Sequence, residues 1–151
     1  MDALGVTDAL THMEWFARPD GSVAISEVAA RPPGAQLSSM HGYAHDFDLF
    51  RAWAELVILG RFDVPERRFA AGTAYLRGLG RGRVRAVHGI EAVQQELGHL
   101  VVEARLPQPG QPAASDYLGE GYVIVRDPDT AVVEDALRRI VGGVRVELAE
   151  A

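Results

Sequence analysis

Residues 12–34 of the chain, HMEWFARPDGSVAISEVAARPPG, decide the fold. Residues 11–18 and 22–30 have the aromatic, β-branched and alternating character of strands. Between them stands Pro19-Asp20-Gly21, a turn sequence in which proline presets one dihedral angle and glycine accepts a positive φ. The sequence therefore predicts a β-hairpin, which residues 31–34 break into a loop.

Two glutamates on this hairpin carry the chemistry. Glu14 and Glu27 lie at comparable distances from the turn, so we expect them to face each other on one side of the strand pair. Opposed carboxylates repel unless a cation lies between them, and Mg²⁺ binds one or two protein carboxylates together with phosphate oxygens and water. Arg31 follows in a loop that ends at Gly34, where a guanidinium could hold a phosphate or acyl-phosphate oxygen.

These segments resemble a known motif. Residues 12–16 (HMEWF), 21–23 (GSV) and 26–34 (SEVAARPPG) are similar to the terminal motif of the ATP-grasp superfamily, which includes biotin carboxylase, carbamoyl-phosphate synthetase and amino-acid ligases. The amino-acid ligase branch is the most similar, through its Arg-x-x-Gly. One position departs from the pattern: Ala29 stands where many members have a metal-binding asparagine, which implies one oxygen ligand fewer.

The resemblance implies a role for each residue of the motif. Glu14 and Glu27 would be Mg²⁺ ligands that bridge the phosphates of ATP. Arg31 would stabilise an acyl phosphate, and Gly34 would assist through its backbone N–H. The parent reaction would be the ATP-dependent joining of a carboxylate substrate to an amine.

The remainder of the chain predicts an α+β fold in two parts. Residues 1–62 would be the C-terminal piece of an ATP-grasp domain, an antiparallel hairpin plus a helix over residues 46–59 with Asp46 as N-cap and Gly60 closing it. Residues 63–151 would be a small, β-rich C-terminal domain. This part of the chain also resembles the C-terminal domain of the ATP-grasp superfamily. Its expected elements are strands at 69–77, 83–87, 100–106, 121–126 and 144–148 and helices at 90–97 and 130–141, the second capped by Thr130.

Composition limits the possible functions. The net charge of −6 disfavours nucleic-acid binding, and no run of about eighteen apolar residues predicts a membrane span. The chain has no cysteine, and its start lacks the features of a secretion signal, so we expect a cytoplasmic protein. All 15 basic residues are arginine, so no lysine can hold a nucleotide phosphate, as lysines in an earlier domain of the family do.

The expectation is therefore a fragment of an ATP-dependent carboxylate–amine ligase, inactive alone and associated with a missing ATP-grasp half or with a second copy. A non-catalytic dimerisation or binding module derived from such an enzyme is the alternative. Simpler roles remain as alternatives: Glu14 and Glu27 could be exposed side chains without a ligand, and Arg31 could form an ion pair with one of them. A zinc site formed by His12, His41 and His45 is a further alternative. For the basic segment 77–85 the sequence favours a solvent-exposed hairpin tip, and a site that binds phosphate or RNA is the alternative.

Overall fold

The computed structural model describes residues 5–6, 8–63 and 65–149. Their contacts divide the chain into two compact units. Unit 1 contains the residues before Tyr43 together with Asp46–Glu66, and unit 2 contains Tyr43–His45 and the residues from Arg67 onward. Among the helices that the structure describes, none is long and apolar enough to cross a membrane. The expected domains, 1–62 and 63–151, stay a prediction.

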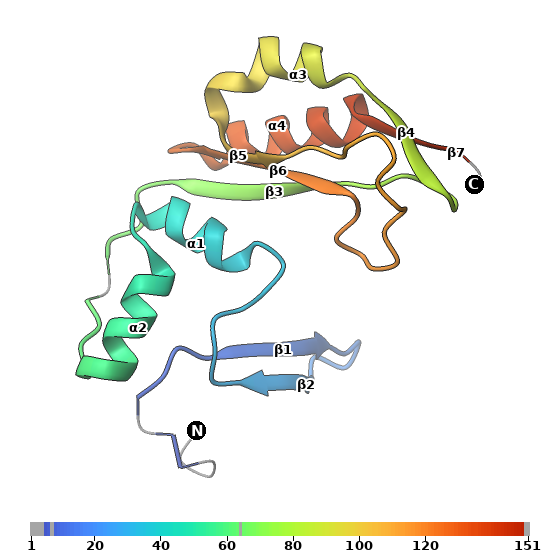
Figure 1. Cartoon of the computed structure of the whole chain (residues 1–151). Coiled ribbons are helices and arrows are strands. Elements are labelled where there is room, and N and C mark those ends of the chain that lie inside the picture. The colour runs from blue at the N-terminus through green and yellow to red at the C-terminus, as the bar shows by residue number, and fades with distance from the viewer. Residues whose placement is uncertain (1–4, 7, 64, 150–151) are drawn as a thin grey trace. The chain divides into compact units, whose positions relative to one another are not determined.

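The predicted hairpin opens unit 1 and is confirmed. Strands β1 (His12–Ala17) and β2 (Val23–Ala29) pair antiparallel and lie side by side in Figure 1. The turn closes as expected, because Gly21 adopts a φ of +81° and its N–H donates to the carbonyl of Arg18 at 2.9 Å. The Ser22 hydroxyl and backbone N–H both donate to Asp20, and these bonds hold the pKa of that carboxyl below its usual value.

Two helices follow the hairpin, and one of them was not predicted. Helix α1 (Leu37–His45) begins after Gln36, and helix α2 spans Leu49–Leu59 and ends at Gly60 with φ +64°. The predicted N-cap of α2 was wrong: Asp46 ends α1 with φ +59°, while Asp48 caps α2 by accepting from the backbone N–H of Arg51 at 3.0 Å. Both aspartates precede the same apolar stripe, so the pattern did not distinguish them.

Unit 2 is built on an antiparallel sheet of order β3-β6-β5 (Figure 1). Its strands are β3 (Ala70–Leu76), β5 (Val101–Arg105) and β6 (Gly121–Asp127). A second strand pair joins β4 (Arg83–His88) to β7 (Arg145–Ala149). The helices are α3 (Ile90–Leu97), a 3₁₀ turn (Gly98–Leu100) and α4 (Thr130–Gly143). The α+β class is thereby confirmed.

Two details of unit 2 correct the sequence-based expectations. Strands β3 and β4 belong to different sheets, so the basic segment 77–85 is not a hairpin tip. The residue that caps α4 is Asp129, which accepts from the backbone N–H of Ala131 at 2.8 Å, and Thr130 is the first helical residue. Thr and Asp both favour the N-cap position, and the aspartate occupies it.

The core of unit 2 forms where α4 covers the sheet. Val133, Ala136 and Ile140 recur at helical spacing on α4 and are almost fully buried. They pack with alternate residues of β3 and β6 and with side chains from α3, β4 and β7. The cluster contains Ala74, Leu76, Val84, Leu97, Leu100, Val123, Val125, Val133, Ala136, Ile140 and Val146.

Candidate functional site

The hairpin register brings the two predicted glutamates together. Glu14 of β1 and Glu27 of β2 are direct partners in the antiparallel ladder, so their side chains leave the same face. His12 and its partner Ala29 stand next to them on that face. The register shifts after Glu14, which leaves Ser26 as the extra residue of a β-bulge beside the pair. We call this side, with His12, Glu14, Phe16, Ala24, Glu27 and Ala29, the carboxylate face.

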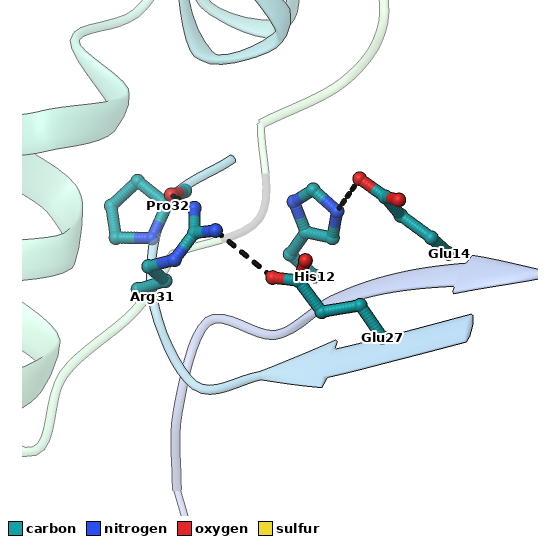
Figure 2. Close-up of polar contacts among 5 residues, drawn as sticks. All are labelled: His12, Glu14, Glu27, Arg31 and Pro32. Carbon is teal, nitrogen blue, oxygen red and sulfur yellow. Dashed lines mark hydrogen bonds and ion pairs between the residues drawn. The ribbon is translucent and has the colours of Figure 1, made fainter. Parts of the chain in front are cut away.

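Each carboxylate has one oxygen engaged (Figure 2). The Nε2 atom of His12 lies 3.1 Å from Oε1 of Glu14, and the guanidinium of Arg31 donates to Oε1 of Glu27 at 3.0 Å. Within the described part of the chain, neither Oε2 takes part in a hydrogen bond. Two carboxylate oxygens on one face thus remain for a hard cation such as Mg²⁺, and the donor set fits that ion.

Arg31 forms the ion pair with a glutamate that was considered as the alternative to phosphate binding. Its ion pair with Glu27 is half exposed, and a second donor bonds the carbonyl of Pro32 at 3.1 Å. A guanidinium has five N–H donors, so this pairing leaves further donors for an anionic oxygen. Pairing with Glu27 and binding of a phosphate are therefore compatible.

The loop that carries Arg31 is fixed to α1. Ser38 is buried, and its hydroxyl donates to the carbonyl of Pro33 at 2.6 Å. At Gly34 an added Cβ would meet no heavy atom within 4 Å, so a ligand could approach this backbone. Ala35 and Gln36 then adopt φ values of +52° and +61°, a conformation that is uncommon for residues other than glycine and is enriched at functional sites.

A pocket adjoins the carboxylate face within unit 1. Its volume is about 440 Å³, and its walls include His12, Glu14, Pro33, Leu37 and His41. A larger pocket of about 550 Å³ lies beside α2 and contains none of the predicted site residues. The smaller pocket is the one that could take part of a substrate beside the carboxylates, because it shares Glu14 with them.

Sequence reasoning missed two residues of this site. His12 was considered only as a member of a zinc site with His41 and His45, although its position two residues before Glu14 on a strand already placed both on one face. Ser38 was not assigned to the predicted site, because the helix that carries it was not predicted. No group of three or more His, Asp or Glu residues that could hold a metal ion occurs among the described residues. The three histidines thus form no zinc site there, and a cation at the carboxylate face would have two protein ligands, Glu14 and Glu27.

The basic segment 77–85 is not part of unit 1, to which the carboxylate face belongs. It belongs to unit 2, where Arg83 donates to the carbonyl of Gly110 at 2.7 Å and Arg85 pairs with Glu147 at 3.2 Å. Both arginines thus bond protein groups within their own unit.

No family model matches the sequence, and no curated protein matches it in sequence. Solved structures do match. The L-amino acid ligase of Bacillus licheniformis superposes with a TM-score of 0.76 at 16% identity, over 99% of this chain and 40% of that one. Phosphoribosylglycinamide synthetase of Anaerococcus prevotii gives a TM-score of 0.67 at 14% identity, over 98% and 39%.

N5-carboxyaminoimidazole ribonucleotide synthetase of Thermotoga maritima gives 0.64 at 19% identity, over 94% of this chain and 38% of that one. The chain therefore shares its fold with a portion of each of these three enzymes, as the resemblance to ATP-grasp enzymes predicted. The chain spans about 40% of the length of these proteins.

Proposed function

We propose that this chain supplies the metal-binding carboxylates and a phosphate-binding arginine to an ATP-dependent carboxylate–amine ligase. The observation that carries the proposal is the direct pairing of Glu14 with Glu27, each with one oxygen engaged and one available. A fold similar to an L-amino acid ligase supports it, since ATP-grasp ligases activate a carboxylate as an acyl phosphate. Such a reaction is consistent with a cytoplasmic protein, where ATP is available.

In this proposal the residues divide the work on one face of the hairpin. Glu14 and Glu27 would hold the cation through the carboxylate oxygens that remain available, and Mg²⁺ there would supply positive charge to the phosphate oxygens of ATP. Arg31 directs its remaining donors at the acyl phosphate, where charge develops. The backbone N–H of Gly34 is the further donor that the motif implies.

The site would not work alone. Phosphoryl transfer needs preorganised cations around the nucleotide in addition to the metal ion, and the chain contains no lysine. We propose that the remaining nucleotide-binding part belongs to protein outside these 151 residues, in the same polypeptide or in a partner chain. We therefore expect the chain by itself to have no useful ligase activity.

The metal site can be tested directly with Mn²⁺, which accepts the same oxygen ligands as Mg²⁺ and is visible by electron paramagnetic resonance. We expect the chain to bind Mn²⁺ and Mg²⁺ to compete. Glu14→Gln and Glu27→Gln should each weaken binding by at least about tenfold, because each removes one of two charged ligands. Glu55→Gln is the matched control, since Glu55 is an exposed glutamate of unit 1 paired with Arg51 on α2.

Calorimetric titration of Mg·ATP into the same variants then asks whether the site also holds phosphate. Binding that is lost in Glu27→Gln and kept in Glu55→Gln would support the proposal. A chain that does not bind Mn²⁺, or that loses binding equally in all three variants, would contradict it.

A second candidate function is a non-catalytic dimerisation or binding module derived from an ATP-grasp enzyme. One observation favours it: the other side of the hairpin is entirely apolar and exposed. We call this the apolar face, and it contains Met13, Trp15, Ala17, Val23, Ile25 and Val28. Indifference to metal ions together with a stable dimer would favour this alternative.

A further inference from the structure

We propose that His12 is a positioning residue of the metal site, whose Nε2–H holds Oε1 of Glu14 so that Oε2 is presented to the cation. The inference rests on the proposed function, because it assigns a role to His12 only if Glu14 binds a metal ion. It adds a residue to which neither the motif nor the fold comparison gave a role.

The geometry of the strand brings the two side chains together. His12 and Glu14 are two residues apart on β1, so both side chains leave the carboxylate face. The Nε2 atom of His12 lies 3.1 Å from Oε1 of Glu14, and Figure 2 shows the ring directed at that carboxylate. The His12 side chain is only 9% exposed, whereas that of Glu14 is 56% exposed. A ring that is largely buried thus restrains a carboxylate that is otherwise exposed to solvent.

The second ring nitrogen indicates which tautomer the ring adopts. Among the described residues, the Nδ1 atom of His12 is buried and has no hydrogen-bond partner. A neutral imidazole carries one N–H donor and one acceptor, and a buried N–H without a partner is rarer than a bare acceptor. The proton therefore belongs on Nε2, where it can be donated to the carboxylate of Glu14.

The orphaned Nδ1 also argues against a role in packing alone. An apolar ring would fill the same wall of the pocket, beside Pro33 and Leu37, without burying an unpaired nitrogen. A histidine at this position is explained if its Nε2–H donor has a function. It leaves Glu14 as a one-oxygen ligand, in the same way that Arg31 leaves Glu27, and Mg²⁺ in its strict octahedron suits such ligands.

Two substitutions separate the donor from the ring. His12→Phe keeps the apolar volume of the ring and removes the donor. His12→Gln loses the ring but retains an amide N–H at about the reach of Nε2. We expect His12→Phe to weaken Mn²⁺ binding by about tenfold or more, the scale of effect known for residues that orient metal ligands, while His12→Gln stays within about threefold of wild type. Thermal unfolding of both variants checks that each is folded.

The outcomes distinguish this inference from the proposed function. Failure of the wild-type chain to bind Mn²⁺ would overturn both. Normal binding in the wild type, with equal binding in His12→Phe, would overturn only the role of His12, and so would a loss of affinity in both variants. The tautomer gives a readout that does not need the metal or a substituted chain. A ¹⁵N NMR spectrum of the wild type should show the neutral ring protonated at Nε2, and protonation at Nδ1 would refute the proposal.

Discussion

At the scale of single residues, the carboxylate face brings like charges together and compensates each of them separately. Direct cross-strand pairing of two carboxylates destabilises a ladder. Here Glu27 is paired with Arg31, and Glu14 accepts from a histidine. Both partners leave one oxygen of each carboxylate available. The like charges are thus compensated while one oxygen of each carboxylate stays available for a cation.

Ala29 offers a test of this face by gain of function. It is two residues beyond Glu27 on β2 and opposite His12, so a side chain there leaves the carboxylate face. We expect Ala29→Asn to raise Mn²⁺ affinity about threefold to tenfold, because the neutral amide oxygen adds a third ligand to the two carboxylates. Titration of Mn²⁺ followed by electron paramagnetic resonance measures the change.

The matched control for this substitution is Ala24→Asn. Ala24 also lies on the carboxylate face and is also half-buried, but it pairs with Phe16 on the turn side of the bulge. Ala24→Asn should leave the Mn²⁺ affinity unchanged. Equal gains in the two variants would mean that any added amide attracts the ion, and the assignment of Glu14 and Glu27 would lose its support.

Much of this residue-scale arrangement could be predicted, because it is local. A tight turn and a two-residue period together determine which side chains of a hairpin share a face, and they placed Glu14 opposite Glu27. The role of His12 could not be predicted in the same way. It depends on the burial of the ring and on the orphaned Nδ1, neither of which a local sequence pattern shows.

At the scale of elements, the failures of prediction have physical causes. Helix α1 begins after Gln36, whose φ is +61°, and has no side-chain cap, so it lacks the usual start signal. Its sequence also contains Gly42 and two serines, which lower helix propensity. The partners of β3 and β4 were missed because each pairs with a strand much later in the chain, and a local pattern carries no information on such pairing.

Gly89 joins β4 to α3 beside the end of α4 and should be essential for the stability of unit 2. It precedes α3 with φ +84°, and an added Cβ would lie 2.1 Å from the carbonyl oxygen of Gly143 at the end of α4. We expect Gly89→Ala to lower the free energy of unfolding by about 2–4 kcal/mol, since it combines backbone strain with overpacking. Urea unfolding followed by circular dichroism measures the loss.

A glycine within α4 provides the comparison. Gly142 is exposed, and a Cβ there would meet no heavy atom within 4 Å. Gly142→Ala should therefore leave stability unchanged or raise it by up to about 1 kcal/mol, the difference in helix propensity. If both substitutions had the same effect, the close approach of Gly89 to α4 would not be the cause.

At the scale of the whole molecule, the two units differ in how they bury apolar surface. Unit 2 has a contiguous core between α4 and its sheet. The hairpin of unit 1 has two strands only, each with an unpaired edge among the described residues, and a two-stranded sheet is marginally stable without further cover. On its apolar face Trp15, Val23 and Ile25 are 52%, 56% and 62% exposed. Such a continuous apolar surface is typical of an interface.

We expect this face to drive self-association when nothing else covers it. The chain should sediment with a weight-average mass that rises with concentration, and the double substitution Trp15→Thr with Ile25→Thr should shift it toward the monomer. Threonine favours strands, so the hairpin itself should persist. The matched control is Leu79→Thr with Val141→Thr, which removes two exposed apolar side chains from unit 2 and should leave the mass unchanged.

The same experiment decides between the two candidate functions when Mn²⁺ binding is measured beside it. One outcome is metal binding together with weak association that the hairpin substitutions abolish. It would indicate a portion of a ligase whose apolar face is covered by the rest of the enzyme. A tight dimer that ignores metal ions indicates a binding module. A wild-type chain that is monomeric at all concentrations would contradict the role given to the apolar face, and it would leave the carboxylate face as the functional surface of the hairpin.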